Sequence, residues 1–405
     1  ISENSNWDEL AKLQARNLPG LHVRSGFARV YEMGPAGAQI FGYIGSPNEA
    51  VPNAPFFTEG ITGLEKRFNK TLAGVPGQTV MITNATGRIT GEDKTQFKQP
   101  ITGNDLITTI DDKAQRVMYD NLMLHGSGCG VALDIETGNI LAMVSAPSFD
   151  PNIFGADDGE EYIASLREDY MKPFMNKTIE GLYPPGSTFK IVVALAALEA
   201  GAITPNEKIF CPGHWDYGDR RYHCWKADGH GWVDLENALK HSCDIYFYQV
   251  ALRIGIDSIK EMALKLGFMQ KYMDDILSRE MAGSIPDRYW KEKQIGYKWM
   301  HGDTIISGIG QGFTLTNCLQ LTIMMARAAS NKVVMPRLIL TEEKPQFANL
   351  GLQRKNINIV LKGLEQVTKR GGTAAGSAIN VNGAKMGGKT GTSQVRSISR
   401  AERLS

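Results

Sequence analysis

The pattern of apolar and polar positions changes near residue 105 of the chain. Residues 1 to about 105 are rich in Gly, Pro, Asn and Thr, with short apolar pieces at 39–44 and 79–82. Apolar spacing over 61–72 predicts one amphipathic helix among loops and short strands. The first part of the chain is therefore expected to contain only short elements.

Beyond residue 107 the pattern predicts longer elements. Residues 111–124 have helical spacing, and Asp111 or Asp112 is a suitable N-cap. Apolar runs at 130–135 and 139–145 flank a Glu-Thr-Gly turn and predict a β-hairpin. We also expect helices over 233–241, 245–254 and 314–329, and a strand over the Gly- and Thr-rich stretch 385–395.

One predicted helix, over residues 187–200, is apolar on most faces. It follows Tyr183-Pro184-Pro185-Gly186, which cannot lie inside a helix, and it stops at Gly201. A helix of this kind belongs at the centre of a domain. Helices clustered between a first hairpin and a last strand indicate a mixed α+β fold, divided into units at 1–105 and 106–405.

Composition and charge exclude several classes of protein. The chain has 405 residues, 42% hydrophobic and 21% charged, which is ordinary for a globular protein of more than one folding unit. With 44 Lys+Arg against 43 Asp+Glu, the net charge of +1 gives no support to nucleic-acid binding. The longest mostly apolar stretch, 191–203, is too short to span a bilayer, so no signal peptide or membrane anchor is expected within this sequence.

A first chemical motif is Ser187-Thr188-Phe189-Lys190. Residues three apart share a helix face, so the Ser187 hydroxyl and the Lys190 amine can come within hydrogen-bonding reach. A neutral lysine can take the proton of a serine nucleophile, and the free N–H groups at a helix start favour a developing oxyanion. Taken alone, the motif more often describes a serine N-cap followed by an exposed lysine, because Ser-x-x-Lys is common by chance.

Two further motifs follow in the chain. Ser242-Cys243-Asp244 lies at the junction of two predicted helices, and Lys389-Thr390-Gly391-Thr392 follows two glycines. A lysine there supplies a cation for a carboxylate, and a strand edge could pair with an extended peptide. Each motif alone would be a turn or an ordinary strand, but the three in this order match the active-serine penicilloyl-transferase signature.

With these motifs the chain resembles class B penicillin-binding proteins, in particular the penicillin-binding protein 2 type of the rod-elongation machinery. The resemblance extends over nearly the whole length. Its other matching segments are Gly63-Leu64-Glu65-Lys66, Gly87-Arg88, Leu133-Asp134 to Pro151, Ile309-Gly310-Gln311-Gly312 and Gly371-Gly372-Thr373-Ala374. The resemblance implies a pedestal (dimerisation-like) domain over 1–105, N-terminally truncated, and a transpeptidase domain over 106–405, C-terminally incomplete.

The family also implies a fold, a reaction and a set of roles. A five-stranded antiparallel sheet packs against an all-helical subdomain, with the active serine between them. The enzyme is a serine-type peptidoglycan D,D-transpeptidase that cross-links D-Ala-D-Ala stem peptides during cell elongation, with a D,D-carboxypeptidase side activity, and it is inhibited covalently by β-lactams. Matched by motif, Ser187 is the nucleophile, Lys190 its base, Ser242 the proton relay with Asp244 beside it, and Lys389, Thr390, Gly391 and Thr392 bind the substrate.

The resemblance has further consequences for position and partners. It implies a single-pass anchor at the periplasmic face of the inner membrane, a SEDS-type (RodA-like) glycosyltransferase and an MreC-like scaffold. The backbone N–H groups of Ser187 and Thr392 would form the oxyanion hole. Many relatives have asparagine at the position of Asp244. A carboxylate there favours the charged form of Lys190, whereas burial and the Lys389 cation favour the neutral amine that a base requires.

Four side chains form a candidate metal site: Cys211, Cys224, His230 and Cys243, separated by 12, 5 and 12 residues. Three cysteines and one histidine are a complete tetrahedral zinc set, although the spacing is not that of a standard zinc finger. The resemblance implies a structural zinc at these positions, and no cofactor for the chemistry. Buried free thiols or one disulfide are the alternative, which an oxidising compartment favours.

The remaining candidate ligands have simpler explanations. Cys243 is the middle residue of the second motif, so its side chain should point away from Ser242. Cys129 and Cys318 are expected in the core, and the odd number of cysteines leaves at least one thiol unpaired. Asp228, His214 and His223 are reserve ligands or solvated loop residues.

Two other functional classes use or retain the same motifs. A serine β-lactamase or a β-lactam-sensing receptor would lack a pedestal of this length, and a class A lactamase needs a further glutamate that no segment clearly supplies. A non-catalytic scaffold would not need Ser187, Lys190, Ser242 and Lys389 intact. In a trapping experiment with labelled penicillin, a stable adduct supports the transpeptidase or the sensor, rapid turnover supports the lactamase, and no adduct supports the scaffold.

Overall fold

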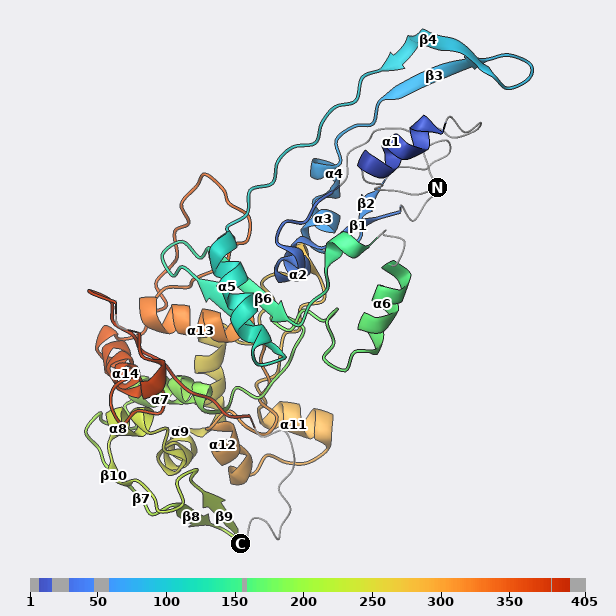
Figure 1. Cartoon of the computed structure of the whole chain (residues 1–405). Coiled ribbons are helices and arrows are strands. Elements are labelled where there is room, and N and C mark those ends of the chain that lie inside the picture. Colours follow the sequence, from blue (N-terminus) through green and yellow to red (C-terminus); the bar gives the residue numbers. More distant parts are fainter. Residues whose placement is uncertain (1–6, 17–28, 47–57, 155–158, 380, 394–405) are drawn as a thin grey trace.

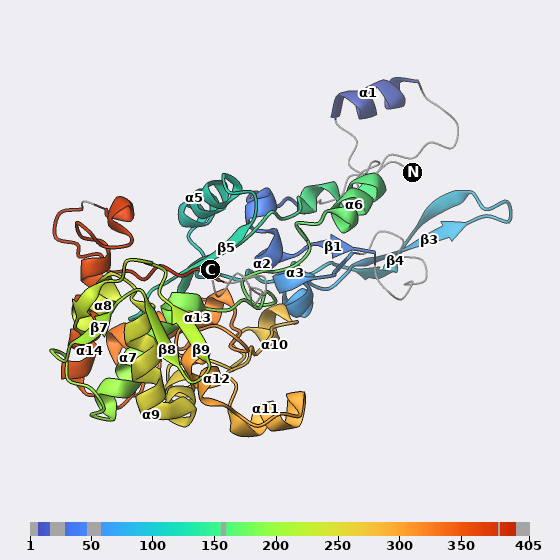
Figure 2. The same cartoon turned by 90° about the horizontal axis from the view of Figure 1, so that it is seen from below.

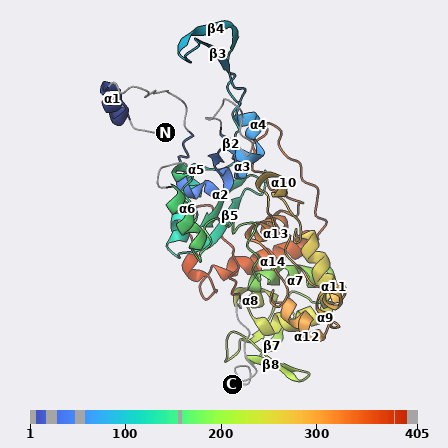
Figure 3. The same cartoon turned by 90° about the vertical axis from the view of Figure 1, so that its right-hand side faces the viewer.

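The computed structural model describes residues 7–16, 29–46, 58–154, 159–379 and 381–393 (Figure 1). A helical body lies at one end of an elongated molecule, and a two-stranded hairpin projects from the other end (Figures 1 and 3). Within these residues, no helix combines the length and the apolar character needed to cross a membrane.

Short elements joined by loops make up the first region, as expected. They are α1 (Trp7–Ala15), η1 (Gly34–Ala36), α2 (Ala38–Phe41), β1 (Ile44–Gly45), β2 (Glu59–Gly60), α3 (Gly63–Arg67), α4 (Asn69–Leu72), β3 (Gln78–Thr83) and β4 (Ile89–Lys98). The pairs β1–β2 and β3–β4 are antiparallel. The single helix predicted over 61–72 is instead two short helices, because Phe68 between them leaves the helical conformation (φ −109°, ψ 21°).

The second region begins with a helix and the predicted hairpin. Helix α5 (Asp112–Met123) is capped by Asp111, whose carboxylate accepts a hydrogen bond from the Ala114 N–H at 2.8 Å. Strands β5 (Gly128–Leu133) and β6 (Ile140–Ala146) pair antiparallel around the Glu-Thr-Gly turn. Helix α5 packs on β6, and the later helix α13 packs on β5.

Helices dominate the rest of the chain (Figure 2). In order, the elements are η2 (Pro151–Ile153), α6 (Gly159–Glu168), η3 (Gly186–Phe189), α7 (Lys190–Glu199), β7 (Ile209–Cys211), β8 (His214–Tyr217), β9 (Arg220–His223), β10 (Gly231–Val233), α8 (Leu235–Lys240), α9 (Asp244–Lys265), α10 (Asp274–Leu277), α11 (Arg288–Ile295), α12 (His301–Ser307), α13 (Cys318–Ser330), α14 (Arg354–Val367) and η4 (Ala375–Ser377). Strand β7 pairs with β10, and β8 with β9.

Helix α7 is the centre of the helical subdomain. All its residues from Lys190 to Leu198 are buried, and it packs against α9 and α14. A fully buried Val, Leu or Ile contributes about 1.5–3 kcal/mol relative to an exposed one, so this helix is a main source of stability. The expectation of a central apolar helix is therefore confirmed.

The antiparallel sheet is smaller than the family implies. Among the described residues of the second region, β5 and β6 form its ladder, and single bridges join Thr108 to Ile339 and Asn139 to Arg337. The prediction of a strand over 385–395 is wrong for residues 385–393, the described part of this range, because they form no strand. The remaining two residues, 394–395, lie outside the description.

The first and second regions share one core. Ile40 and Leu64 belong to the same buried cluster as Ile140 and Met143 of β6. The side chain of Gln115 is fully buried and donates to the carbonyls of Ala36 at 2.7 Å and Met143 at 2.9 Å. These contacts fix the base of the first region to the hairpin that supports the site.

Candidate active site and metal-ligand cluster

Ser187 lies in a tight turn at the start of the central helix. Residues 186–189 form η3, a 3-10 turn that continues into α7, rather than the α-helix expected from the sequence. Gly186 has φ +56°, and a Cβ at this position would lie 2.6 Å from the Thr392 carbonyl oxygen. Glycine is therefore required for this close approach between the Ser187 turn and the segment that follows Lys389.

Lys190, one turn after Ser187, is completely buried. Its Nζ donates to Oδ1 of Asp244 at 2.7 Å, to the Ser242 carbonyl at 2.9 Å and to Ser242 Oγ at 3.3 Å. A buried charge is tolerated only when it is paired and hydrogen-bonded, as it is here. Among the described residues no hydrogen bond joins Lys190 to the Ser187 hydroxyl, which remains half-buried.

Ser242 connects the second and third motifs. Its Oγ accepts a hydrogen bond from Lys389 Nζ at 2.8 Å, in addition to the contact with Lys190. The residue has φ +52°, a left-handed conformation that is uncommon for serine and typical of functional sites. The structure therefore brings Lys190 and Lys389 to the Ser242 hydroxyl, and Asp244 is bound to Lys190.

Lys389 has an altered electrostatic environment. Burial and the nearby positive charge of Lys190 lower the pKa of Lys389 to about 7, and Asp244 opposes the shift. Its ammonium also donates to the Thr390 carbonyl at 3.1 Å. A cation that titrates near neutral pH can both bind a carboxylate and exchange a proton with Ser242.

The other residues of the third motif lie beside the Ser187 turn. The hydroxyls of Thr390 and Thr373 are 2.9 Å apart. The side chain of Gln311 donates to the Thr392 carbonyl at 2.9 Å. The segment 389–392 is therefore placed by loop contacts, since it has no ladder partner among the described residues.

Trp225 is a site residue that sequence reasoning missed. Its backbone N–H donates to Oδ2 of Asp244 at 2.9 Å, and its indole Nε1 donates to the carbonyls of His241 at 2.9 Å and Ser242 at 3.1 Å. It thus holds both the carboxylate and the strained backbone of the second motif. Its position directly after Cys224 was the only available signal.

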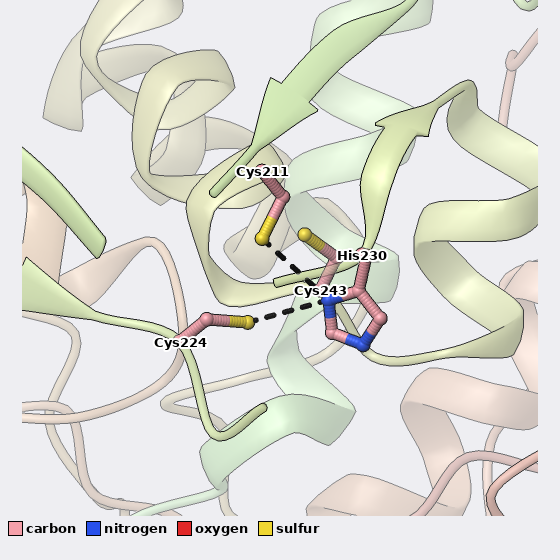
Figure 4. A group of neighbouring side chains, drawn as sticks. All are labelled: Cys211, Cys224, His230 and Cys243. Atoms are coloured by element: carbon pink, nitrogen blue, oxygen red, sulfur yellow. Dashed lines mark hydrogen bonds between the residues drawn. The ribbon is translucent and has the colours of Figure 1, made fainter. Parts of the chain in front are cut away.

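The four predicted metal ligands converge in one cluster (Figure 4). Their ligand atoms all lie within 4.8 Å of one another. His230 Nδ1 is 3.6 Å from the sulfur of Cys211 and 3.5 Å from that of Cys224. The reserve candidates Asp228, His214 and His223 are not part of this cluster.

Three strand ends and one helix start supply these side chains. Cys211 ends β7, Cys224 follows β9, His230 precedes β10, and Cys243 is the N-cap residue of α9. A hydrogen bond with Cys243 lowers the pKa of Cys224 to about 5 and raises the pKa of Cys243. The Cys243 thiol faces the cluster while the Ser242 hydroxyl faces the lysines, as the alternation of the motif predicts.

Comparison with known proteins places this chain in a family. The penicillin binding protein transpeptidase domain matches residues 128–402, and the penicillin-binding protein dimerisation domain matches residues 1–108. The chain therefore belongs to the penicillin-binding protein transpeptidase family, with a dimerisation domain in front. The fold class predicted from the sequence is confirmed.

Individual relatives are named as peptidoglycan D,D-transpeptidases. The peptidoglycan D,D-transpeptidase MrdA of Escherichia coli K12 is 34% identical over 340 residues, covering 80% of this chain and 53% of MrdA. MrdA of Haemophilus influenzae is 34% identical over 411 residues, covering 95% and 62%. The chain thus spans little more than half the length of these curated relatives.

Solved structures agree with these relatives. Pseudomonas aeruginosa PBP2 in complex with WCK 5153 is 33% identical, with a TM-score of 0.77 over 92% of this chain and 82% of that one. Helicobacter pylori PBP2 in complex with MreC is 30% identical, with a TM-score of 0.78 over 90% and 69%. The resemblance to the penicillin-binding protein 2 type is therefore confirmed.

Proposed function

We propose that this chain is the extracytoplasmic part of a peptidoglycan D,D-transpeptidase of the elongation type. The observation that carries the proposal is that Lys190 and Lys389 both contact the Ser242 hydroxyl, and that Lys190 lies one helical turn after Ser187. The family match and the MrdA and PBP2 relatives support the same reaction class.

The first half of the reaction forms an acyl-serine. The Ser187 hydroxyl attacks the carbonyl carbon between the two D-Ala residues, and its proton passes to the amine of Lys190. The proton then reaches the departing D-Ala amine through Ser242 Oγ, which contacts the amines of both lysines. Lys389 and Thr390 bind the substrate carboxylate, and the N–H groups of Ser187 and Thr392 stabilise the oxyanion.

The second half transfers the acyl group. An amine of a second stem peptide attacks the acyl-serine and releases its proton along the same route, which regenerates Ser187 and forms the cross-link. A β-lactam acylates the same serine but leaves no small group to depart. Asp244 contacts Lys190 Nζ at 2.7 Å and so orients this amine beside Ser242 Oγ.

We also propose a structural zinc ion at Cys211, Cys224, His230 and Cys243. With Zn–S of about 2.3 Å and Zn–N of about 2.0–2.1 Å, a tetrahedron has an S–N edge of about 3.6 Å. The two Sγ–Nδ1 distances of 3.5 and 3.6 Å fit that edge. The ion would hold the loop that carries Ser242 and would take no part in the chemistry.

Partners and localisation follow from the same proposal. A relative of this fold is solved with MreC, and another belongs to a peptidoglycan synthase complex. We infer an MreC-like scaffold and a SEDS-type glycosyltransferase as partners, at the periplasmic face of the inner membrane. Single-pass anchoring of the full-length protein is part of this inference.

Labelled penicillin tests the central assignment. The expected result is a stable adduct of one penicillin per chain, mapped by mass spectrometry to the peptide that contains Ser187. Ser187→Ala should give no adduct, while Ser165→Ala on the exposed side of α6 should react normally. Rapid turnover of the label would indicate a lactamase, and an adduct on Ser187→Ala would show that the nucleophile is another residue.

A further assay tests the reaction itself. A stem pentapeptide that ends in D-Ala-D-Ala should exchange its last residue for a labelled D-amino acid in the presence of the wild-type protein. Ser187→Ala should abolish the exchange. Penicillin binding without exchange would favour a β-lactam sensor.

A further inference from the structure

Two cysteines outside the metal-ligand cluster lie side by side where α13 packs on β5. Cys129 is in β5, and Cys318 is the first residue of α13, which packs on β5. Their side chains hydrogen-bond each other, and both residues are half-buried. The proposed reaction uses neither thiol, and both were expected to be plain core residues.

The surroundings of the two thiols are unequal. The hydrogen bond with Cys318 and the positive charge of Lys177 lower the pKa of Cys129, although burial opposes the shift. The same hydrogen bond and burial raise the pKa of Cys318. The Lys177 ammonium is fixed in place because it donates to the carbonyls of Lys172 at 3.2 Å and Pro147 at 3.4 Å.

A fixed cation beside two adjacent thiols is the arrangement of a reactive pair. The thiolate is the nucleophile in disulfide exchange, and a nearby lysine favours it. Cys129 therefore suits the attacking role and Cys318 the resolving role. A buried cysteine without such neighbours is inert.

We propose that Cys129 and Cys318 form a reversible intramolecular disulfide by exchange with a disulfide oxidant. The Cys129 thiolate attacks one sulfur of the oxidant and expels a thiolate, which leaves a mixed disulfide. Cys318 then loses its proton and attacks the Cys129 sulfur, which expels the second thiolate. Two protein thiols are oxidised, and one disulfide of the oxidant is reduced to two thiols.

The position of the pair gives the bond a structural consequence. Two residues before Cys318, Thr316 pairs with Tyr183 through backbone hydrogen bonds of 2.9 and 3.0 Å. Tyr183 in turn leads into the turn that carries Ser187. A disulfide would therefore fix β5 to the start of α13 next to the support of the nucleophile. It would also close a loop of roughly 190 residues, a length at which cross-linking strongly restricts the unfolded chain.

Peptide mapping after controlled oxidation tests the proposal. The purified full chain is reduced in the absence of chelator, desalted and incubated with oxidised glutathione, and free thiols are then alkylated. We expect one peptide pair that joins residues 129 and 318, reversed by dithiothreitol. We also expect a rise in Tm of about 5 °C or more over the reduced protein.

Two single variants serve as controls. Cys129→Ser and Cys318→Ser should each lose the linked peptide and the oxidation-dependent rise in Tm, and in reductant each should melt close to the wild type. The proposal is overturned if oxidised glutathione leaves both thiols open to alkylation, stops at a mixed disulfide, or links either cysteine to another partner. None of these outcomes depends on acylation of Ser187, so they leave the proposed transpeptidase function untouched.

Discussion

The Ser242 hydroxyl lies at the centre of the candidate active site, because the amines of two lysines contact it. Lys389 approaches to 2.8 Å and Lys190 to 3.3 Å, so two like charges lie close together. The left-handed backbone of Ser242 makes this possible, since it turns the side chain toward the lysines while Cys243 faces the metal-ligand cluster. Asp244 compensates for part of the repulsion through its contact with Lys190.

The lowered pKa of Lys389 predicts a pH-dependent affinity for carboxylates. Because that pKa is about 7, the ammonium form falls tenfold for each pH unit above neutrality. We expect the dissociation constant for penicillin to rise about tenfold per unit between pH 7.5 and 9, measured by calorimetry on Ser187→Ala, which cannot be acylated. Arginine stays charged throughout, so adding Lys389→Arg should flatten the profile. A profile that is equally flat with Lys389 would show that this cation does not bind the carboxylate.

The ion pair predicts two separable effects of removing Lys190. Lys190→Ala should lower the acylation rate by at least about a thousandfold, since the base is lost. It should also cost about 3–5 kcal/mol of stability, because Asp244 would remain buried and unpaired. Adding Asp244→Asn should restore most of the Tm without restoring acylation. Acylation of Lys190→Ala at the normal rate would assign the base to another group.

At the scale of elements, local signals were sufficient where one segment determines its own structure. Asp111 caps α5, and the Glu-Thr-Gly turn joins β5 to β6, because capping and hairpin formation depend on neighbouring residues. The strand over 385–395 could not be predicted reliably, since a strand exists only with a partner and glycines add little intrinsic preference. Trp225 was missed for the same reason: its contacts with Asp244 and Ser242 are distant in sequence.

The candidate site shows the same division. The three motifs could be located because their residue types and order are specific, and the four metal ligands because Cys and His are few. The sequence could not show that Lys190 binds Asp244 instead of Ser187, because this choice depends on how α7 and α9 pack. It also could not show that Ser187 lies in a 3-10 turn, which depends on Gly310 accepting the Gly186 N–H.

The metal-ligand cluster predicts a coupling between a loop and the active site. If zinc binds there, Cys224→Ser should lower the metal content below one equivalent per chain. Stability should fall by at least about 2 kcal/mol, because the unfolded chain has no preformed site. Acylation should slow as well, since Cys243 and Ser242 are adjacent and a loosened turn misplaces the hydroxyl. Elemental analysis, thermal melting and penicillin labelling measure the three effects.

Cys318→Ser, measured in reductant, is the matched thiol control because this cysteine lies outside the cluster. It should retain zinc, Tm and acylation. Wild-type protein that contains no metal and responds to reductant rather than chelator would favour a disulfide within the cluster. Metal-free protein with normal Tm and normal acylation would contradict the coupling.

At the scale of the whole molecule, the base of the first region and the second region are one packed structure. Ile40 and Leu64 share a core with β6, and Gln115 bonds to backbone groups on both sides. The boundary predicted near residue 105 thus marks a change in the pattern of apolar and polar residues. The hydrophobic core continues across it. Strands β3 and β4 differ, since they project beyond this core (Figures 1 and 2).

The projecting hairpin is therefore expected to be dispensable for folding and acylation. Its apolar side chains Met81, Ile82, Ile89 and Phe97 are 42–57% exposed, and an isolated two-stranded hairpin contributes little stability. Replacing residues 79–97 by a short Gly-Ser linker should change Tm by less than about 2 °C and leave the penicillin acylation rate within about twofold.

Gln115→Leu is the opposite control, because this side chain lies in the shared core. The substitution leaves three buried backbone groups of Ala36 and Met143 without their hydrogen-bond partner and should lower Tm by at least about 5 °C. A large fall in Tm or in the acylation rate on removing the hairpin would contradict this prediction. It would show that the hairpin stabilises the rest of the molecule.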